Sequence, residues 1–158
     1  MRSLKHPLLD PILDIDYLTD SGLVVVIRDF NSKGTLKDLI HESRPKDNYD
    51  YKYRTPGRAL PEPTIAMFGR QILEALLYLD RCKYPYTHLH SGNIVVDKDI
   101  CKLTDLELPL LKVNRRYEDL FREYAVRNRE AFLVADLNVL AFGCVLHEMA
   151  TGACADVE

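Results

Sequence analysis

Between residues 62 and 82, apolar residues follow one another at intervals of three or four: Ile65, Phe68, Ile72, Leu76 and Leu79. This spacing predicts one long amphipathic helix, and Pro63 suits its first turn. A second, strongly apolar helix is expected over residues 131–151 and should end at Gly152. Its composition predicts that it is buried nearly all round.

Shorter apolar runs predict strands. Residues 12–18 alternate in part between apolar and acidic side chains, as a half-buried strand does, whereas Leu23–Ile27 is a continuous run that predicts a strand buried on both faces. Turn-forming residues between them indicate a hairpin. Two further strands are expected in residues 93–97 and 101–105, joined by a tight Asp-Lys-Asp connection.

A short helix and a long polar stretch lie between these elements. Thr35 is expected to cap a helix over residues 36–40. Residues 44–63 then contain four prolines and three closely spaced tyrosines, Tyr49, Tyr51 and Tyr53. This composition predicts a long loop, which is either a solvated insertion or a regulated or partner-binding segment.

Bulk composition narrows the classes of function. Hydrophobic residues make up 47% of the chain and charged residues 28%, with a net charge of −3. A nucleic-acid partner is disfavoured because no basic field covers the chain. Direct membrane insertion is not expected, since the longest aliphatic run, Leu23–Ile27, is far too short to cross a bilayer. Four separated cysteines without a C-x-x-C pair favour a reducing, cytoplasmic setting.

The stretch from Pro85 to Glu107 holds the polar residues of greatest chemical interest. Asn93 stands at the start of one predicted strand, and Asp105 stands at the end of the next. Amide and carboxylate oxygens are ligands that Mg²⁺ prefers, so this pair predicts a metal-holding, nucleotide-binding loop. No carboxylate able to act as a base lies just upstream, where histidines stand instead.

Two of those histidines, His88 and His90, have the spacing H-x-H. A zinc site is one interpretation of this spacing, but no third ligand is evident nearby and the pattern alone is weak. Polar residues that fill a loop are the favoured interpretation.

The segment NVLAFGCVLHEMATG, residues 138–152, resembles the large central helix of the protein-kinase catalytic domain, written D-x-W-S-x-G-x-x-L-x-E-M-x-x-G. Alignment on Gly143 places Asn138 where the family has an Asp that pins the catalytic loop. The resemblance implies that Asn138 is the structural anchor of that loop. Asp136 would take over this role only with a shifted helix start.

The kinase catalytic loop reads H-R-D-x-x-x-x-N and is followed, after two strands, by D-F-G. Asn93 matches the Asn, and Asp105 matches the Asp of D-F-G, so the resemblance implies that these two residues are the metal ligands. His88 stands where the family has its catalytic Asp, His90 where it usually has a lysine, and Glu107 where it has the glycine of D-F-G. The resemblance therefore implies a kept metal-binding frame without the usual base.

The segment VIRDFNSKGTL, residues 26–36, resembles the strand and hinge that hold adenine in kinases. This resemblance implies that the nucleotide-contacting residues are Asp29, Phe30, Asn31 and Val95. Arg28 occupies the position of the residue before the hinge. We favour an Arg28 that is paired with a carboxylate; the alternative is an Arg28 that replaces a lost phosphate-contacting lysine or fills the adenine pocket.

The order of elements thus resembles a truncated protein-kinase fold of the α+β class. Residues 1–30 are expected to be the end of the N-lobe, with two strands and the hinge, and residues 31–158 a partial, mainly helical C-lobe. Within that lobe we expect the insertion over 44–63, the catalytic-like loop over 85–93 and the central helix over 131–151. Because the Gly-rich loop, the strand lysine and the later helices are absent, a fragment of a longer protein is expected.

The segments GTLKDLI, GRQILEAL, HLHSGN and DLE most resemble those of the PX-domain kinase-like proteins and the slowpoke-binding protein. This resemblance implies a pseudokinase scaffold that binds protein partners, such as ion channel or trafficking proteins, with or without ATP and Mg²⁺. Any association with the membrane surface would come through parts outside this chain. The alternative is an active, divergent ATP-dependent Ser/Thr kinase that uses His88 as its base.

Overall fold

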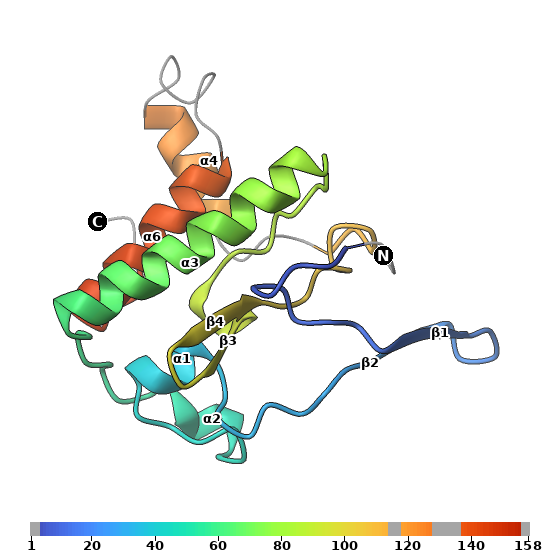
Figure 1. The fold of residues 1–158 in the computed structure, drawn as a ribbon, viewed down its shortest axis with the longest axis horizontal. Helices are drawn as coiled ribbons and strands as arrows, with labels where there is room; N and C mark the ends of the chain where they lie inside the picture. The colour runs from blue at the N-terminus through green and yellow to red at the C-terminus, as the bar shows by residue number, and fades with distance from the viewer. Residues whose placement is uncertain (1–3, 114–117, 128–136, 156–158) are drawn as a thin grey trace.

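A computed structural model describes residues 4–113, 118–127 and 137–155 of the chain. Helices and two separate two-stranded antiparallel sheets make up this part of the protein, which confirms the predicted α+β class. The helices and one sheet gather into a body, and the other sheet extends away from it as a ribbon (Figure 1). In the described ranges, no helix is both long enough and apolar enough to cross a membrane.

The long amphipathic helix α3 spans Glu62–Arg81, one residue shorter than its prediction. Pro63 lies in its first turn, where a missing N–H costs no hydrogen bond. The side chains that it buries most deeply are Phe68, Ile72, Ala75 and Leu79. This face packs against α6 (Leu137–Thr151) and β4 (Ile100–Leu103), so α3 joins the helical layer to the small sheet.

Helix α6 lies beside α3 and ends, as predicted, at Gly152, whose φ of +77° is the left-handed conformation that glycine adopts without strain. The expected start at residue 131 falls outside the described residues. The prediction of burial all round is wrong, because Val139 and other positions are exposed. The buried residues of α6 are Ala141, Cys144, Val145, Glu148 and Met149. The described part of the chain covers this helix on one side.

The two helices approach closely at Gly69 of α3. A Cβ atom at this position would lie 3.2 Å from Cδ2 of Leu146 on α6, closer than ordinary van der Waals contact. The missing side chain therefore lets the backbone of α3 come near the side chains of α6.

Strands β3 (Ile94–Asp97) and β4 form the predicted hairpin. Gln71 of α3 fixes it from the side, because its Oε1 accepts from the Cys101 backbone N–H at 2.7 Å and its Nε2 donates to the Asp99 carbonyl oxygen at 2.7 Å. Residues 8–10 hydrogen-bond to Leu103 from the other edge. This small sheet is thereby held in place on both sides, next to the candidate site.

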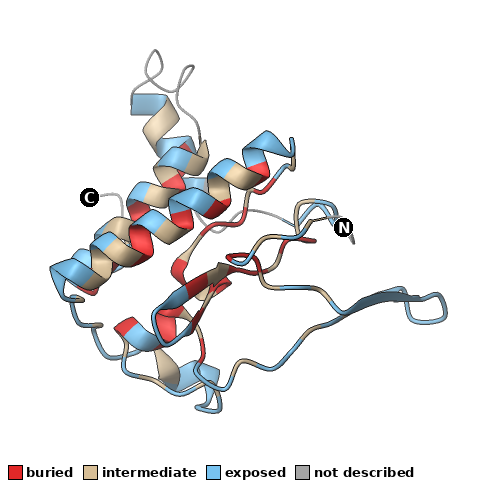
Figure 2. Ribbon diagram, viewed as in Figure 1, coloured by how far each residue is buried: buried red, intermediate tan, exposed pale blue. Residues whose placement is uncertain are grey.

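Strands β1 (Asp14–Leu18) and β2 (Leu23–Ile27) form the other predicted hairpin, with Gly22 in its turn at a φ of +66°. The predictions of a half-buried first strand and a fully buried second strand are wrong, since both faces of the ribbon are largely exposed (Figure 2). The described residues place no other layer against either face. The division of the chain at residue 30 into two lobes stays a prediction.

The predicted loop over residues 44–63 is partly folded. Helix α1 (Leu36–Ile40) begins with a capping box, in which Oγ1 of Thr35 accepts from the Asp38 N–H at 3.2 Å and Oδ2 of Asp38 accepts from the Thr35 N–H at 2.9 Å. The insertion then forms a short helix, α2 (Tyr49–Lys52), which lies below α1 in Figure 1. It is a docked segment rather than a fully solvated loop.

A cluster around Asp38 holds this insertion. The carboxylate of Asp38 is 2% exposed, and its Oδ1 accepts from the Tyr53 hydroxyl at 2.7 Å, the Ser43 hydroxyl at 3.2 Å and the Lys52 ammonium at 2.7 Å. The ammonium of Lys37 lies 4.4 Å from the centre of the Tyr53 ring, a cation–π contact. One buried carboxylate thus joins α1 to the last residue of α2, Lys52, and to Tyr53, which follows it.

The protonation of Asp38 is coupled to this cluster. Burial by itself raises its pKa, but hydrogen bonds from Lys52, the Thr35 N–H and Tyr53 outweigh burial and lower the pKa below its usual value. Burial and the hydrogen bond to Asp38 raise the pKa of Tyr53. Since the folded-state pKa of Asp38 lies below its unfolded value, the stability it contributes is present above the unfolded pKa and is lost as the pH falls through the folded pKa.

Replacing Asp38 with alanine should lower the free energy of unfolding by about 2–4 kcal/mol, because it removes the cap and leaves Lys52 and Tyr53 without their acceptor. Urea unfolding near pH 7 measures this loss. The difference from the unsubstituted protein should shrink as the pH falls below the usual range of an Asp carboxyl. Glu74→Ala, at an exposed position on α3, is the control and should change stability little. Equal effects of the two substitutions would contradict the role of the cluster.

Candidate functional site

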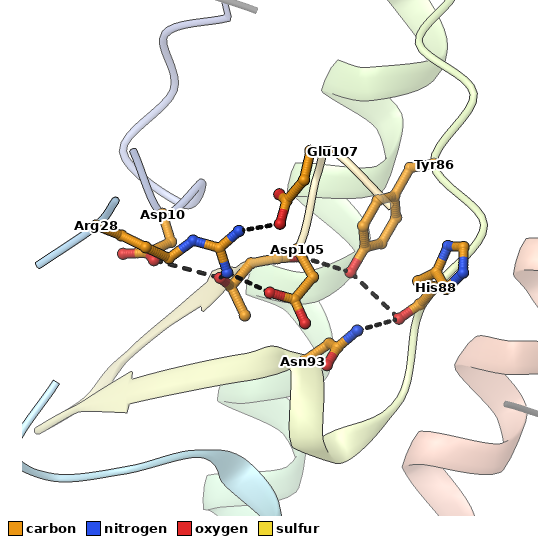
Figure 3. Close-up of polar contacts among 8 residues, drawn as sticks. Asp10, Arg28, Tyr86, His88, Asn93, Asp105 and Glu107 are labelled. Atoms are coloured by element: carbon orange, nitrogen blue, oxygen red, sulfur yellow. Dashed lines mark hydrogen bonds and ion pairs between the residues drawn. The ribbon is translucent and has the colours of Figure 1, made fainter. Parts of the chain in front are cut away.

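The catalytic-like loop, residues 85–93, runs from α3 to β3 and ends in a short 3-10 helix at Ser91–Asn93. Its buried Asn93 donates through Nδ2 to the His88 carbonyl oxygen at 3.1 Å (Figure 3). The carbonyl oxygen of Asn93 accepts from the Thr104 N–H at 3.1 Å. Asn93 therefore closes the loop on itself and ties it to the residues after β4.

Tyr86 is a positioning residue that sequence reasoning did not single out. Its hydroxyl group donates to the Thr104 carbonyl oxygen at 3.2 Å and lies 3.5 Å from the His88 carbonyl oxygen (Figure 3). Tyr86 is only 1% exposed. Burial, and after it the charges of Asp105 and Glu107, raises the pKa of Tyr86, so it stays a neutral donor. The sequence feature that points to Tyr86 is its position, since it stands where kinases have the His of H-R-D.

His88 lies where a kinase has its catalytic Asp, and the surrounding chain occupies both of its ring nitrogens. Nε2 lies 2.8 Å from the Val113 carbonyl oxygen and Nδ1 lies 3.1 Å from the Thr87 hydroxyl. Because a carbonyl oxygen only accepts, Nε2 carries the hydrogen, and in the neutral ring Nδ1 accepts from Thr87. The residue is 4% exposed, so the ring presents no open lone pair to a substrate hydroxyl.

His90, in the place of the kinase lysine, acts locally in the backbone of the loop. Its Nδ1 accepts from the Gly92 N–H at 3.1 Å and caps the 3-10 helix. A Cβ atom at Gly92 would lie 3.0 Å from the His90 ring, so glycine suits this contact. In the described ranges, no group of three or more His, Cys, Asp or Glu side chains is arranged to hold a metal ion.

Arg28 reaches from the end of β2 to the segment that follows β4 (Figure 3). Its Nη1 donates to Oδ1 of Asp105 and, at 3.0 Å, to the Thr104 hydroxyl, while its Nη2 donates to Oε1 of Glu107. The favoured interpretation of Arg28, a guanidinium paired with a carboxylate, is confirmed, and two carboxylates take part. The arginine and its partners come from segments almost eighty residues apart.

Charge balance explains why this group stays together. Burial favours loss of the proton from Arg28, but hydrogen bonds and charge from Asp105 and Glu107 outweigh burial and raise its pKa above the usual value, so it stays a cation. The Thr104 hydroxyl also lies 3.3 Å from Oδ2 of Asp10. Burial raises the pKa of Asp10, against the lowering effects of Thr104 and Arg28.

In the arrangement that the structure shows, Mg²⁺ would have to compete with Arg28 for Asp105. Asp105, one of the two predicted metal ligands, already pairs with Arg28, and Asn93, the other, is buried with its amide nitrogen on the His88 carbonyl oxygen. A divalent cation that used Oδ1 of Asp105 would have to displace the guanidinium of Arg28 from that atom.

A separate cavity of about 280 Å³ lies at the hinge and brings together four residues predicted to contact a nucleotide: Asp29, Phe30, Asn31 and Val95. The Asn31 amide donates to the carbonyl oxygens of Gly34, at 3.0 Å, and Val96, at 3.2 Å, and so ties the hinge to β3. The contact of these four residues with a nucleotide stays a prediction. A larger cavity of about 800 Å³, bordered by residues 4–7 and 9–15, Lys102 and Leu106, contains none of the predicted site residues.

The anchor of the loop stays a prediction. Asn138 lies in the first turn of α6, and Asp136 lies outside the described residues.

The model of the protein tyrosine and serine/threonine kinase family matches residues 1–156. The chain belongs to the protein kinase family. Among curated relatives, it is 39% identical over 154 residues to a probable inactive serine/threonine-protein kinase, slob2, of Dictyostelium discoideum. It is 35% identical to the slowpoke-binding protein of Drosophila melanogaster and 40% identical to a PX domain-containing protein kinase-like protein of Mus musculus, each over 155 residues.

These matches confirm the kinase-like group expected from the sequence. Each covers 96% of this chain but only 25%, 29% and 25%, respectively, of the three relatives. The chain therefore spans little more than a quarter of the length of the curated relatives it matches.

Replacing Tyr86 with phenylalanine should lower the free energy of unfolding by about 1–2 kcal/mol, because the buried carbonyl oxygen of Thr104 loses a donor while the ring stays. Urea unfolding of the full-length protein measures the loss. Tyr51→Phe is the matched control, since the Tyr51 side chain is 64% exposed. A loss of the same size in both variants would show that the Tyr86 hydroxyl does not position the loop.

Proposed function

We propose that this chain is part of a kinase-like protein that binds protein partners and does not transfer phosphate. The observation that carries the proposal is the state of His88, the residue in the position of the catalytic base. Its two ring nitrogens are engaged by Thr87 and Val113, and it is 4% exposed. A side chain held in this way has no atom free to take a proton from a substrate.

Phosphoryl transfer needs positioned metal ions, neutralised phosphate charge and an oriented nucleophile, and little else from the protein. A neutral imidazole at position 88 supplies no negative charge to orient a hydroxyl group. The carboxylate of Asp105, which would hold the metal, is paired with Arg28. Two separate requirements of the reaction are therefore unmet at one site, which supports the role of a binding module.

The proposed partners are proteins of the ion channel or membrane-traffic class. One relative is by name a slowpoke-binding protein, and another by name carries a PX domain. The docked insertion presents Tyr49 and Tyr51, which are 73% and 64% exposed, beside the cluster of Asp38. We propose that this exposed face of α2 contributes to partner binding, which keeps the interpretation of residues 44–63 as a functional segment.

Kinase domains in general bind ATP with Mg²⁺. For this chain we propose that the hinge cavity formed by Asp29, Phe30, Asn31 and Val95 keeps room for the adenine base. We also propose the two-lobe division at residue 30 and the anchoring of the catalytic-like loop by Asn138. The alternative function is that of an active Ser/Thr kinase that uses His88 as its base.

The full-length protein, incubated with γ-labelled ATP and either Mg²⁺ or Mn²⁺, should incorporate no more label into itself or a general kinase substrate than its Asp105→Ala variant does. His88→Asp alone should not restore transfer, because Asp105 stays paired with Arg28 in that variant. Robust incorporation that Asp105→Ala abolishes would overturn the proposed function.

A further inference from the structure

Arg28 and Glu107 both depart from the kinase pattern, and they meet each other. Arg28 stands at the position before the hinge, and Glu107 stands where D-F-G has its glycine. They are separated by 79 residues in sequence, yet Nη2 of Arg28 donates to Oε1 of Glu107. Glu107 without Arg28 would leave a nearly buried carboxylate without this cationic partner, and Arg28 supplies the one cation that Asp105 and Glu107 share.

The guanidinium also binds one of the two carboxylate oxygens of Asp105 that a metal would use. Nη1 of Arg28 donates to Oδ1 of Asp105 and to the Thr104 hydroxyl, so one planar group binds oxygen atoms of three side chains (Figure 3). A planar, permanently charged fork suits such a set of acceptors, as a metal ion suits a set of oxygen ligands. Arg28 makes these contacts with 21% of its side chain exposed.

Burial makes the arrangement hard to open. The side chain of Glu107 is 7% exposed, and its Oε2 is buried without a hydrogen-bond partner among the described residues. If Arg28 swung away, the carboxyl group of Glu107 would lose this cationic partner in a nearly dry position. A divalent cation that bound Oδ1 of Asp105 or Oε1 of Glu107 would have to displace the arginine from that atom.

We propose that Arg28 takes the place of the divalent cation at this site, with Glu107 as its second support, so that any nucleotide that binds does so without a metal. The proposal rests on the proposed function, because it concerns the same kinase-like site. It explains why Asp105 is kept in a chain that lacks the usual base: the carboxylate is one side of an internal ion pair. Arg28 and Glu107 are positioning residues under this proposal.

The decisive test is thermal unfolding of the full-length protein with a non-hydrolysable ATP analogue, in excess Mg²⁺ and, separately, in EDTA. The shift in Tm that the analogue causes in the unsubstituted protein should be equal in Mg²⁺ and in EDTA, whether that shift is zero or not. Arg28→Met should gain a shift that requires Mg²⁺, because Asp105 and Glu107 then face an open position. Asp105→Asn in the Arg28→Met background should remove the gain. Arg58→Met is the matched control, since Arg58 pairs with the exposed Glu42 at 3.1 Å.

Direct titration with Mn²⁺, followed by the electron paramagnetic resonance signal of the free ion, reads the same site without nucleotide. Arg28→Met should bind at least one ion about ten-fold more tightly than the unsubstituted protein does. If Arg28→Met does not fold, as judged by circular dichroism, Glu107→Gly removes one support of the arginine and should show the gain in part. If neither variant folds, Mn²⁺ binding to the unsubstituted protein is compared with Mn²⁺ binding to Asp105→Asn, and equal affinities would support the proposal.

A Mg²⁺-dependent shift in the unsubstituted protein that Asp105→Asn abolishes would overturn the inference, as would folded Arg28→Met without any gain in metal binding. Neither result depends on phosphate transfer. A protein that binds Mg²⁺ at Asp105 but transfers no phosphate would overturn this inference and leave the proposed function in place. A protein that transfers phosphate would overturn the proposed function itself.

Discussion

The ion pairs of Arg28 with Asp105 and Glu107 join the strand before the hinge to the segment after β4. Among the described residues no other ion pair joins these two parts, and the two pairs lie beside the loop that carries His88 and Asn93. Partly buried carboxylates at this position need a cation, whether a metal ion or a side chain. Here Arg28 supplies a cation to both carboxylates from within the chain.

The loop beneath this ion pair keeps its shape through hydrogen bonds rather than through catalytic groups. Asn93 donates to the His88 carbonyl oxygen, and Tyr86 donates to that of Thr104. His88 and His90 use their ring nitrogens for contacts within the same chain. The polar groups of this loop are thus bonded within the chain, as a loop that serves to hold the fold requires.

The insertion shows the same physical requirement on the other side of the hinge. Asp38 is buried at the start of α1, and a buried carboxylate must be hydrogen-bonded. The chain provides these hydrogen bonds through the Thr35 N–H at the start of α1 and through Lys52 and Tyr53 of the insertion. The segment is therefore ordered against α1 while Tyr49 and Tyr51 stay exposed. Rigid placement of exposed aromatic side chains is a property expected of a binding surface.

Much of the local structure followed from the sequence alone. The apolar period located α3 to within one residue, Thr35 and Gly152 marked helix ends, and the order of elements indicated the kinase family. The counts from Asn93 identified His88 and Asp105 as the positions that matter. These features depend on near neighbours in the chain, or on motifs with fixed spacing, so a sequence carries them directly.

Burial and pairing were decided only by the tertiary structure. The run Leu23–Ile27 predicted a buried strand, but burial depends on which other elements lie against it, and the described residues place none there. The composition of residues 44–63 predicted a loop because the need of Asp38 for partners is not visible in that segment. The sequence predicted that Arg28 pairs with a carboxylate but did not identify Asp105 and Glu107 as its partners. These contacts span almost eighty residues, so they are determined by tertiary packing and not by local spacing.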